Sequence, residues 1–305
     1  MIRRRAVLEA ALGSFALPLL PRLAQAAGGL GIAAIADELA LVTGAGGNVL
    51  VLSADAGQVV VDSGAAEFAA ALLATLAELP GGGRVQKLFN THWHSDQVGG
   101  NEPLGRAGAV IVAHEKTRQR LSTDYFLPTE DRYQRALPVA ARPTETFYTR
   151  AATAVGDHRI EYGYLLEAHT DGDIYVKFRE ANVIAAGDAI APERDPQLDW
   201  FGGGWLGGRV DALALLLDLS DDETRFVPAY GAVVGRSAVQ AEHDMLLALF
   251  ERMVDRVRRG ESAEEILAAG VLEDLGRSFA EPLKLVHDAH KGLWAHHNTL
   301  SPDVV

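Results

Sequence analysis

The chain has 305 residues, 48% of them hydrophobic and 23% charged, so it can bury a large core in one or two domains. The formal net charge is −13 and argues against a nucleic-acid partner, because phosphate binding requires a positive face. The absence of cysteine excludes disulfides, thiolate metal ligands and a cysteine nucleophile. Any metal site must therefore be built from histidine, carboxylate or neutral oxygen groups.

Residues 1–26 have the pattern of an export leader. Three arginines precede a mostly apolar stretch that reaches Leu20, and Ala24-Gln25-Ala26 has the small-x-small form of a cleavage site. The start resembles a twin-arginine signal, which exports folded proteins. The alternative is an N-terminal membrane anchor, but prolines and charges interrupt a span already shorter than the ~20 residues that a bilayer needs. We expect residues 27–305 to form the mature domain, periplasmic or secreted, without stable membrane insertion.

The first half of the mature chain alternates short β-rich runs with turns. A helix is predicted at 65–79, where Pro80 and three glycines end it, and another at about 115–121. Residues 122–150 read as one long irregular loop with several prolines and aromatics, which is typical of a lid or binding element. The predicted strands of this half are 39–43, 48–53, 58–61, 85–89 and 109–113.

The second half repeats the alternation of strands and helices. Gly156-Asp157 predicts a hairpin turn, and a strand at 164–167 is expected to lead to His169. Two β-rich halves, each followed by helices, favour two packed sheets covered on the outside by helices. The other predicted elements are strands at 174–178, 182–186 and 225–227 and helices at 209–219 and 237–259.

Two histidines directly follow the predicted strand 85–89. On extended chain, the imidazoles of His92 and His94 point to the same side. Zinc binds imidazole nitrogen at ~2.0–2.1 Å and keeps an open position at catalytic sites, so this pair can supply two of three protein ligands. A His-x-His pair can also be an accident of a loop. Here Asp96 follows at close spacing, and His169 and Asp188 stand at remote strand ends.

Together these segments resemble the metallo-β-lactamase fold superfamily. The matching segments occur in the family's order: Thr-His-Trp-His-Ser-Asp at 91–96, Ala-His-Thr at 168–170, Ala-Gly-Asp at 186–188 and Val-Pro-Ala-Tyr-Gly at 227–231. The resemblance covers nearly all of the mature chain. It implies the α/β (α+β) class and a four-layer αββα sandwich of two mixed β-sheets flanked by helices, with the site on the open edge between the sheets.

The resemblance also implies roles for these residues. His92, His94 and His169 would hold a first metal ion, which we expect to be zinc. Asp96 would orient or deprotonate the nucleophilic water, or serve a second metal, and Asp188 would stand where two-metal members have a bridging carboxylate. A metal lowers the pKa of water towards ~7 and polarises the bond that is cleaved.

Two residues depart from the family pattern. Gln97 stands where many members have a histidine, and Tyr230 replaces the histidine of a late Pro-Gly-His-Gly motif. An amide oxygen is a weak, neutral ligand, and a phenol of pKa about 10 must lose its proton to bind well. We expect one firmly held zinc ion. The second position is left open between no metal, a weak site built on Asp96 and Asp188, and a site that uses Tyr230.

Several other side chains have expected places. His114 is expected to pack or to cap a helix, Asp171 and Asp173 to orient His169 or cap turns, and Asp62 to fix nearby loops. The C-terminal histidines at 287, 290, 296 and 297 are expected on a solvated helix face. Large apolar side chains commonly line small-molecule pockets. The candidate substrate-lining residues are Trp93, Trp200, Phe201 and Trp205. For the last three of these, burial against the 122–150 loop is an equally good explanation.

The expected activity is zinc-dependent hydrolysis of a small ester, lactone, thioester or amide, with β-lactams included. The fold alone does not select the substrate, and the sequence indicates no oligomeric state. The alternative is a non-catalytic periplasmic relay protein that binds zinc or a small molecule in the same cleft. Loss of two second-site histidines favours this alternative, whereas retention of Asp96 and Asp188 opposes it. Iron oxidoreductase chemistry is disfavoured, because di-iron members carry a carboxylate where this chain has His94.

Overall fold

Continuous apolar runs form the strands of two sheets, because strands buried on both faces need no polar alternation. The computed structural model describes residues 24–25, 29–127 and 131–296. The larger sheet is antiparallel from β1 to β5 and parallel from β5 to β10. Its strands, in spatial order, are β1 Ala24–Gln25, β2 Gly31–Ala36, β3 Leu39–Thr43, β4 Val49–Ala54, β5 Gly57–Val61, β6 Val85–Phe89, β7 Val110–His114 and β10 Glu145–Phe147.

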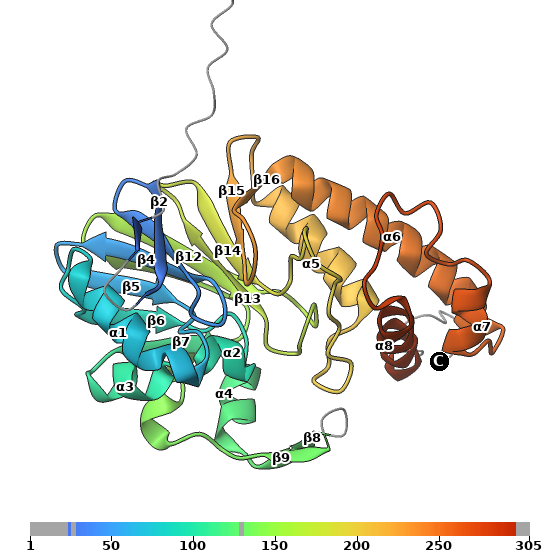
Figure 1. Ribbon diagram of the computed structural model, residues 1–305, viewed down its shortest axis with the longest axis horizontal. Helices are drawn as coiled ribbons and strands as arrows, with labels where there is room; N and C mark the ends of the chain where they lie inside the picture. The colour runs from blue at the N-terminus through green and yellow to red at the C-terminus, as the bar shows by residue number, and fades with distance from the viewer. Residues whose placement is uncertain (1–23, 26–28, 128–130, 297–305) are drawn as a thin grey trace, which may run out of the picture.

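The second sheet faces the first and is antiparallel except for the parallel pair β14 and β15. A separate hairpin, β8 Tyr125–Leu127 with β9 Arg132–Gln134, extends from the molecule below the first sheet in Figure 1. The strands of the second sheet, in spatial order, are β11 Arg150–Val155, β12 His158–Tyr164, β13 Ile174–Phe178, β14 Val183–Gly187, β15 Arg225–Pro228 and β16 Val234–Gly235.

Helices cover the outer face of each sheet (Figure 1). The first sheet is covered by the helices of the N-terminal half and the second by those of the C-terminal half. In chain order the helices are η1 Ala66–Phe68, α1 Ala69–Glu78, α2 Ser95–Val98, α3 Asn101–Arg106, α4 Glu115–Ser122, η2 Val139–Ala141, α5 Leu206–Asp218, α6 Arg236–Arg258, α7 Ala263–Ala268 and α8 Pro282–Ala295.

Three apolar layers hold this arrangement together. Leu72 and Leu76 of α1 pack on the outer face of the first sheet. Between the sheets, the rings of Phe89 and Tyr162 lie 4.9 Å apart. Leu213 of α5 belongs to the third layer, which fills the space between the second sheet and its helices. The predicted four-layer αββα sandwich is thus confirmed.

Two local expectations were wrong. Residues 122–150 are not one irregular loop, because β10 pairs with β7 and the β8–β9 hairpin lies within the segment. These strands have three residues each, too few for an alternating pattern to be read. The strand expected at 164–167 is absent, because β12 ends at Tyr164 and Glu167 adopts a left-handed φ of 50°.

The predicted leader falls almost entirely outside the described residues. Of residues 1–26, the structure describes Ala24 and Gln25, which pair with β2. Within the described part of the chain, no helix has both the length and the apolar character to cross a membrane. The leader and its cleavage remain predictions.

Candidate metal centre

Three histidine side chains meet at the edge between the two sheets. His92 and His94 follow β6, whereas His169 lies in the turn between β12 and β13. One ring nitrogen from each lies within 4.8 Å of the others. Each pair of ring centroids is 4.8 Å apart, with the rings nearly perpendicular. The structure therefore brings together the three side chains that the sequence assigned to the first metal.

Nitrogen atoms of this cluster lack hydrogen-bond partners although they are buried. His92 Nδ1 lies 3.1 Å from Thr91 Oγ1, and its Nε2 has no partner. Both ring nitrogens of His169 are also unpaired. An unsatisfied buried polar group costs about 1–3 kcal/mol, and a cation between the rings would satisfy these atoms. The first position thus fits a metal ion that prefers imidazole, as zinc does.

Burial keeps two of the rings in the neutral form that a metal requires. It lowers the pKa of His92 to about 3, with a further lowering by the nearby His94. Burial also lowers the pKa of His169 well below its usual value. For His94, burial acts in the same direction, but the hydrogen bond to Asp199 and the negative charges of Asp199, Asp96 and Asp188 together raise the pKa. Neutral imidazole is the ligand form of histidine.

Asp62 and Thr91 support His92 from the end of β5. Asp62 accepts hydrogen bonds from the Thr91 backbone N–H at 2.7 Å and from Thr91 Oγ1 at 2.8 Å. Burial raises the pKa of Asp62 to about 8. Gly187 packs closely against Thr91 and has a φ of 54°. A Cβ at Gly187 would collide with Thr91 Oγ1. Glycine is therefore required where β14 delivers Asp188 to the site.

Asp173 supports His169 in a similar way. Its Oδ2 accepts from the backbone N–H groups of His169 and Thr170, both at 2.6 Å. Its Oδ1 lies 3.8 Å from His169 Nδ1. Burial raises the pKa of Asp173 to about 7. Asp171 instead pairs with Arg120 at 3.0 Å, so of the two aspartates it is Asp173 that fixes the His169 turn.

Asp199 is a site residue that the sequence reasoning missed. Its Oδ2 lies 3.0 Å from His94 Nε2, and its Oδ1 accepts from the Gly202 N–H at 2.8 Å. A histidine that donates one N–H to a carboxylate has its other nitrogen fixed for a metal. Burial acts to raise the pKa of Asp199, but the hydrogen bonds with His94 and the Gly202 N–H and the nearby positive charges together lower it. The carboxylate therefore stays ionised beside His94.

Asp96 sits in the first turn of α2 and is held by both residues that depart from the family pattern. Its Oδ2 accepts from Gln97 Nε2 at 3.1 Å and from the Tyr230 hydroxyl. Burial acts to raise the pKa of Asp96, but the hydrogen bond from Tyr230 and the nearby histidines lower it overall. Burial, together with the bond to Asp96, raises the pKa of Tyr230, so the phenol keeps its proton.

Asp188 faces both the histidines and an arginine that the sequence reasoning did not single out. Its Oδ2 lies 3.7 Å from His92 Nε2, and its Oδ1 forms an ion pair with Arg194. The guanidinium carbon of Arg194 lies 3.8 Å from the centre of the Tyr230 ring. The four side chains expected at the second position therefore all form hydrogen bonds or ion pairs with other protein groups. They are Asp96, Gln97, Asp188 and Tyr230. Gln97 Oε1 is buried without a hydrogen bond to any described residue, but an amide oxygen is a weak neutral ligand, so the second position fits a metal ion less well than the first.

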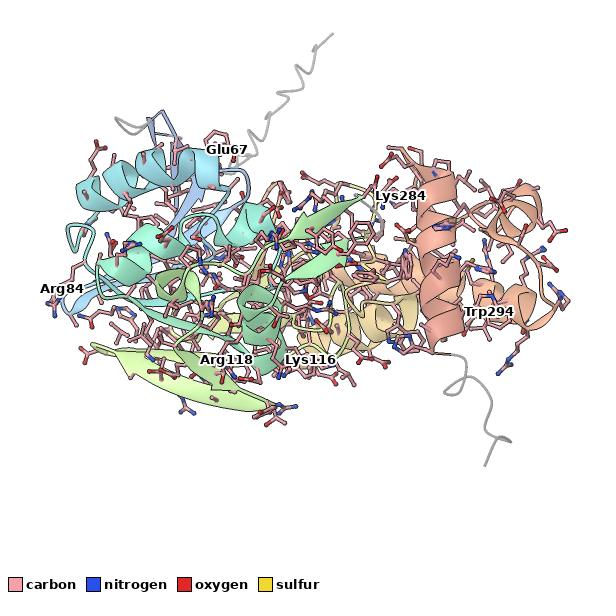
Figure 2. The ribbon with its side chains drawn as sticks, turned by 90° about the horizontal axis from the view of Figure 1, so that it is seen from below. Glu67, Arg84, Lys116, Arg118, Lys284 and Trp294 are labelled. Carbon is pink, nitrogen blue, oxygen red and sulfur yellow. The ribbon has the colours of Figure 1, made fainter. Side chains whose placement is uncertain are left out.

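A cavity of about 480 Å³ opens over His94 and His169. Figure 2 shows Lys284 on α8 beside the β8–β9 hairpin, and this lysine and His287 form the far wall. His287 was expected on a solvated helix face, whereas it borders the cavity. The apolar lining consists of Trp93, Leu127, Leu198 and Trp200.

The candidate aromatic residues take different places. Trp93 lines the cavity, and so does Trp200, for which the sequence left lining and burial open. Phe201 packs beside Trp93 in a small apolar cluster under the hairpin. Trp205 does not belong to the cavity wall, because its ring stacks on His296 at 4.3 Å and packs against α6. His114 caps α4 and stacks on Tyr164, which is the structural role expected for it. His297 lies outside the described residues.

Comparisons with known proteins agree with this geometry. A sequence model of the metallo-beta-lactamase superfamily matches residues 42–229. Curated proteins give no significant match. Among solved structures, a metallo-beta-lactamase from Pontibacter korlensis is similar with a TM-score of 0.57 and 22% identity, over 72% of this chain and 99% of that chain.

Two further structures share the fold. The sec-alkylsulfatase Pisa1 from Pseudomonas sp. has a TM-score of 0.64 and 15% identity, over 90% of this chain and 52% of that chain. The chain thus spans about half the length of that enzyme. The DIM-1 metallo-beta-lactamase has a TM-score of 0.57 and 15% identity, over 74% of this chain and 99% of that chain. At these identities the similarity shows the fold and leaves the substrate open.

Proposed function

Because the chain belongs to the metallo-beta-lactamase superfamily, whose members are metal-dependent hydrolases, we propose that it hydrolyses a small ester, lactone, thioester or amide with the help of one zinc ion. β-Lactams fall within this substrate class. The observation that carries the proposal is the cluster of His92, His94 and His169, in which one ring nitrogen of each lies within 4.8 Å of the others and buried nitrogens of His92 and His169 have no hydrogen-bond partner in the described chain. The ionised carboxylate of Asp96 lies nearby.

The three histidines would hold the zinc ion, and the surrounding residues fix them for this task. Thr91 and Asp62 hold His92, Asp199 holds His94, and Asp173 holds the His169 turn. Zinc supplies a Lewis acid that makes water nucleophilic near neutral pH and polarises the scissile carbonyl. The supporting hydrogen bonds keep the ligand geometry fixed before any ion arrives, which lowers the cost of binding.

Asp96 is the group that we assign to proton transfer. Its Oδ2 is occupied by Gln97 and Tyr230, whereas its Oδ1 has no hydrogen bond within the described part of the chain. The lowered pKa keeps the carboxylate ionised at neutral pH. A fixed, ionised carboxylate with one open oxygen can orient the attacking water and accept its proton.

The cavity supports a small-molecule substrate. Its volume of about 480 Å³ lies within the ~300–1,000 Å³ usual for such sites. Trp93 and Trp200 give it apolar walls, and the histidines form one polar side. An apolar group of the substrate would pack between the tryptophans while the bond to be cleaved faces the histidines.

A second candidate function is a non-catalytic periplasmic protein that binds zinc or a small molecule in the same cavity. The engaged state of the second position favours it, because many hydrolases of this superfamily use two metals. Turnover distinguishes the two candidates. Zinc-loaded protein is assayed against nitrocefin, lactones, thioesters and aryl phosphates, with His92→Ala as the control.

Under the proposed function, at least one carbonyl substrate turns over, chelation stops the reaction and the control is inactive. Tight zinc binding without turnover of any compound would favour the binding protein instead. Aryl phosphate turnover in place of carbonyl turnover would correct the substrate class.

We also propose that the protein works in the periplasm or outside the cell, with 27–305 as its mature domain. The leader pattern of residues 1–26 supports this location. Cell fractionation with N-terminal sequencing tests it, with a substitution of the Arg4-Arg5 pair by lysines as the control. Recovery of the uncleaved chain in the cytoplasm would contradict the proposal.

A further inference from the structure

Arg194 reaches the second metal position from the segment between β14 and α5. We infer that its guanidinium takes the place of a second metal cation, so that the site holds one metal ion per chain. This inference rests on the proposed function, since it concerns the same site. It assigns a role to a residue that the sequence motifs do not include.

The contacts of Arg194 connect both carboxylates of the second position. Its Nη2 pairs with Asp188 Oδ1, and its guanidinium carbon lies 3.8 Å from the centre of the Tyr230 ring. The Tyr230 hydroxyl in turn donates to Asp96 Oδ2. One positive group thus meets one carboxylate directly and the other through the stacked phenol.

The charge of this region explains why a cation is needed there. Asp188 is buried, with a side chain that is 5% exposed, and Asp96 stands nearby as a second carboxylate. Burying an ionised carboxylate is costly unless it is paired. Arginine stays protonated across the physiological pH range and presents a planar group that suits both a carboxylate and an aromatic face. It can therefore supply permanently the charge that a metal supplies only when bound.

A second metal ion would have to undo these contacts. It would displace the guanidinium from Asp188 and compete with two hydrogen-bond donors for Asp96 Oδ2. The neutral side chains nearby, Gln97 and Tyr230, offer weak compensation as ligands. The balance favours the arrangement that the protein already has.

The backbone around Arg194 is fixed on both sides, so the side chain is not free to swing away with its loop. Ala191 N–H donates to both carboxylate oxygens of Glu242, at 3.0 and 2.9 Å. The buried Arg209 pairs with Glu242 at 3.1 Å and donates to the Gln197 carbonyl at 3.0 Å. These bonds hold the chain three residues before and three residues after Arg194.

Asp195 adds a third anchor. Its carboxylate accepts from the backbone N–H groups of Ala280 and Glu281 at 3.1 and 2.7 Å, just before α8. The segment that carries Arg194 is therefore tied to α6, α5 and the start of α8. Such anchoring is what a fixed positive charge in a site requires, because a side chain on a mobile loop would exchange with solvent cations.

Metal counting tests this inference. Wild type, Arg194→Ala, Arg194→Gln and the double variant Arg194→Ala/Asp188→Asn are equilibrated with rising zinc, and bound metal per chain is measured by dialysis and mass spectrometry. Cobalt titration gives a second reading from its absorption bands. Arg256→Ala is the matched control, since Arg256, near the C-terminal end of α6, also forms a partly buried ion pair, with Glu261 at 2.7 Å.

We expect one metal per chain in wild type and in the control. Both Arg194 single variants should gain a second equivalent, with its apparent Kd lowered at least about tenfold, which corresponds to about 1.4 kcal/mol. The double variant should lose that equivalent again, because Asp188 is then neutral.

Two tightly bound metals in wild type, or a single metal in both single variants at every zinc concentration, would overturn the inference. The first of these outcomes is measured on wild type and therefore does not depend on whether a variant folds. A His169→Ala variant tests the first metal position, on which the proposed function depends, whereas the Arg194 variants test the second position. Failure of wild type to bind any metal would contradict the proposed function, whereas an unchanged count on removal of Arg194 would contradict this inference alone.

Discussion

The two halves of the site lie side by side but differ in how far their side chains pair with other protein groups. Around the histidines, buried nitrogens face one another without partners. A short distance away, Asp96 and Asp188 are paired with Gln97, Tyr230 and Arg194. The first half has three buried imidazole nitrogens without partners among the described residues, whereas the carboxylates of the second half are each paired through at least one oxygen. Under the proposed function, this difference means that internal pairing occupies the second metal position while the framework of the site stays intact.

The difference also assigns separate tasks to the two halves. In our proposal the first binds the cation, and its supporting aspartates act on ligand geometry. The second half holds Asp96 ionised and fixed, and we propose that Asp96 acts on water rather than as a ligand. Substitutions in the two halves should therefore change different measured quantities.

Asp96→Asn should have the largest effect on turnover. The variant keeps the size of the side chain but loses the charge, so kcat should fall by about 10²–10⁴-fold, the usual contribution of a general base. Metal content should stay at one per chain, as measured by mass spectrometry alongside steady-state kinetics. Loss of the metal in this variant would place Asp96 among the ligands and remove the contrast between the two halves.

Asp199→Ala should weaken zinc binding at the first position by roughly 10–100-fold, the usual effect of removing a carboxylate that orients a metal-binding histidine. Competition with a zinc-binding dye measures the affinity. The matched control is Asp244→Ala, because Asp244 lies 3.0 Å from His243 on the exposed side of α6, away from the site. Equal zinc affinity in wild type and Asp199→Ala would refute the positioning role.

Trp200→Ala should raise KM by roughly tenfold through the loss of apolar contact in the cavity, with little change in kcat. Trp205→Ala is the comparison, because this ring packs on His296 and α6 rather than in the cavity. We expect it to lower the melting temperature and leave KM near the wild-type value. A rise in KM that is as large for Trp205→Ala would mean that Trp205 contacts the substrate as Trp200 does.

Asp62 should give metal-free protein a distinct pH dependence of stability. Its carboxyl has a folded pKa of about 8 and an ordinary value of 3.8, so the folded state holds the extra proton between these values. Stability should therefore fall as pH rises from about 4 to about 8, by at most roughly 1.4 kcal/mol per pH unit, and then level off.

The Asp62→Asn side chain cannot ionise, so the variant should lack the part of the pH dependence of stability that comes from Asp62. Urea denaturation at pH 5, 6.5 and 8 measures it as the difference between wild type and variant. A difference in stability that is constant with pH would show that Asp62 is ionised throughout.

The fold and the first metal position were largely predictable because their signals are local. Apolar runs end at His92 and Asp188, and strand ends are where sheet proteins collect functional side chains. The three histidines could be grouped from their motifs before any distance was known. The layers followed from the alternation of strands and helices along the chain.

The residues that were missed act through tertiary contacts with no periodic pattern. Arg194 and Asp199 lie in the irregular segment between β14 and α5, and their partners are distant in sequence. The far wall of the cavity comes from α8, nearly two hundred residues after His94. Trp205 was grouped with Trp200 by proximity in sequence, but its ring packs against Phe250 of α6 and His296.

The most direct test of the account is the zinc content of wild type and of His169→Ala, each purified without chelator and then saturated with zinc. Three histidines, each with a ring nitrogen within 4.8 Å of the others, predict one zinc per chain in wild type and none in the variant. Absence of zinc from wild type under every loading condition, or an equal content in the variant, would contradict the assignment of the first metal position.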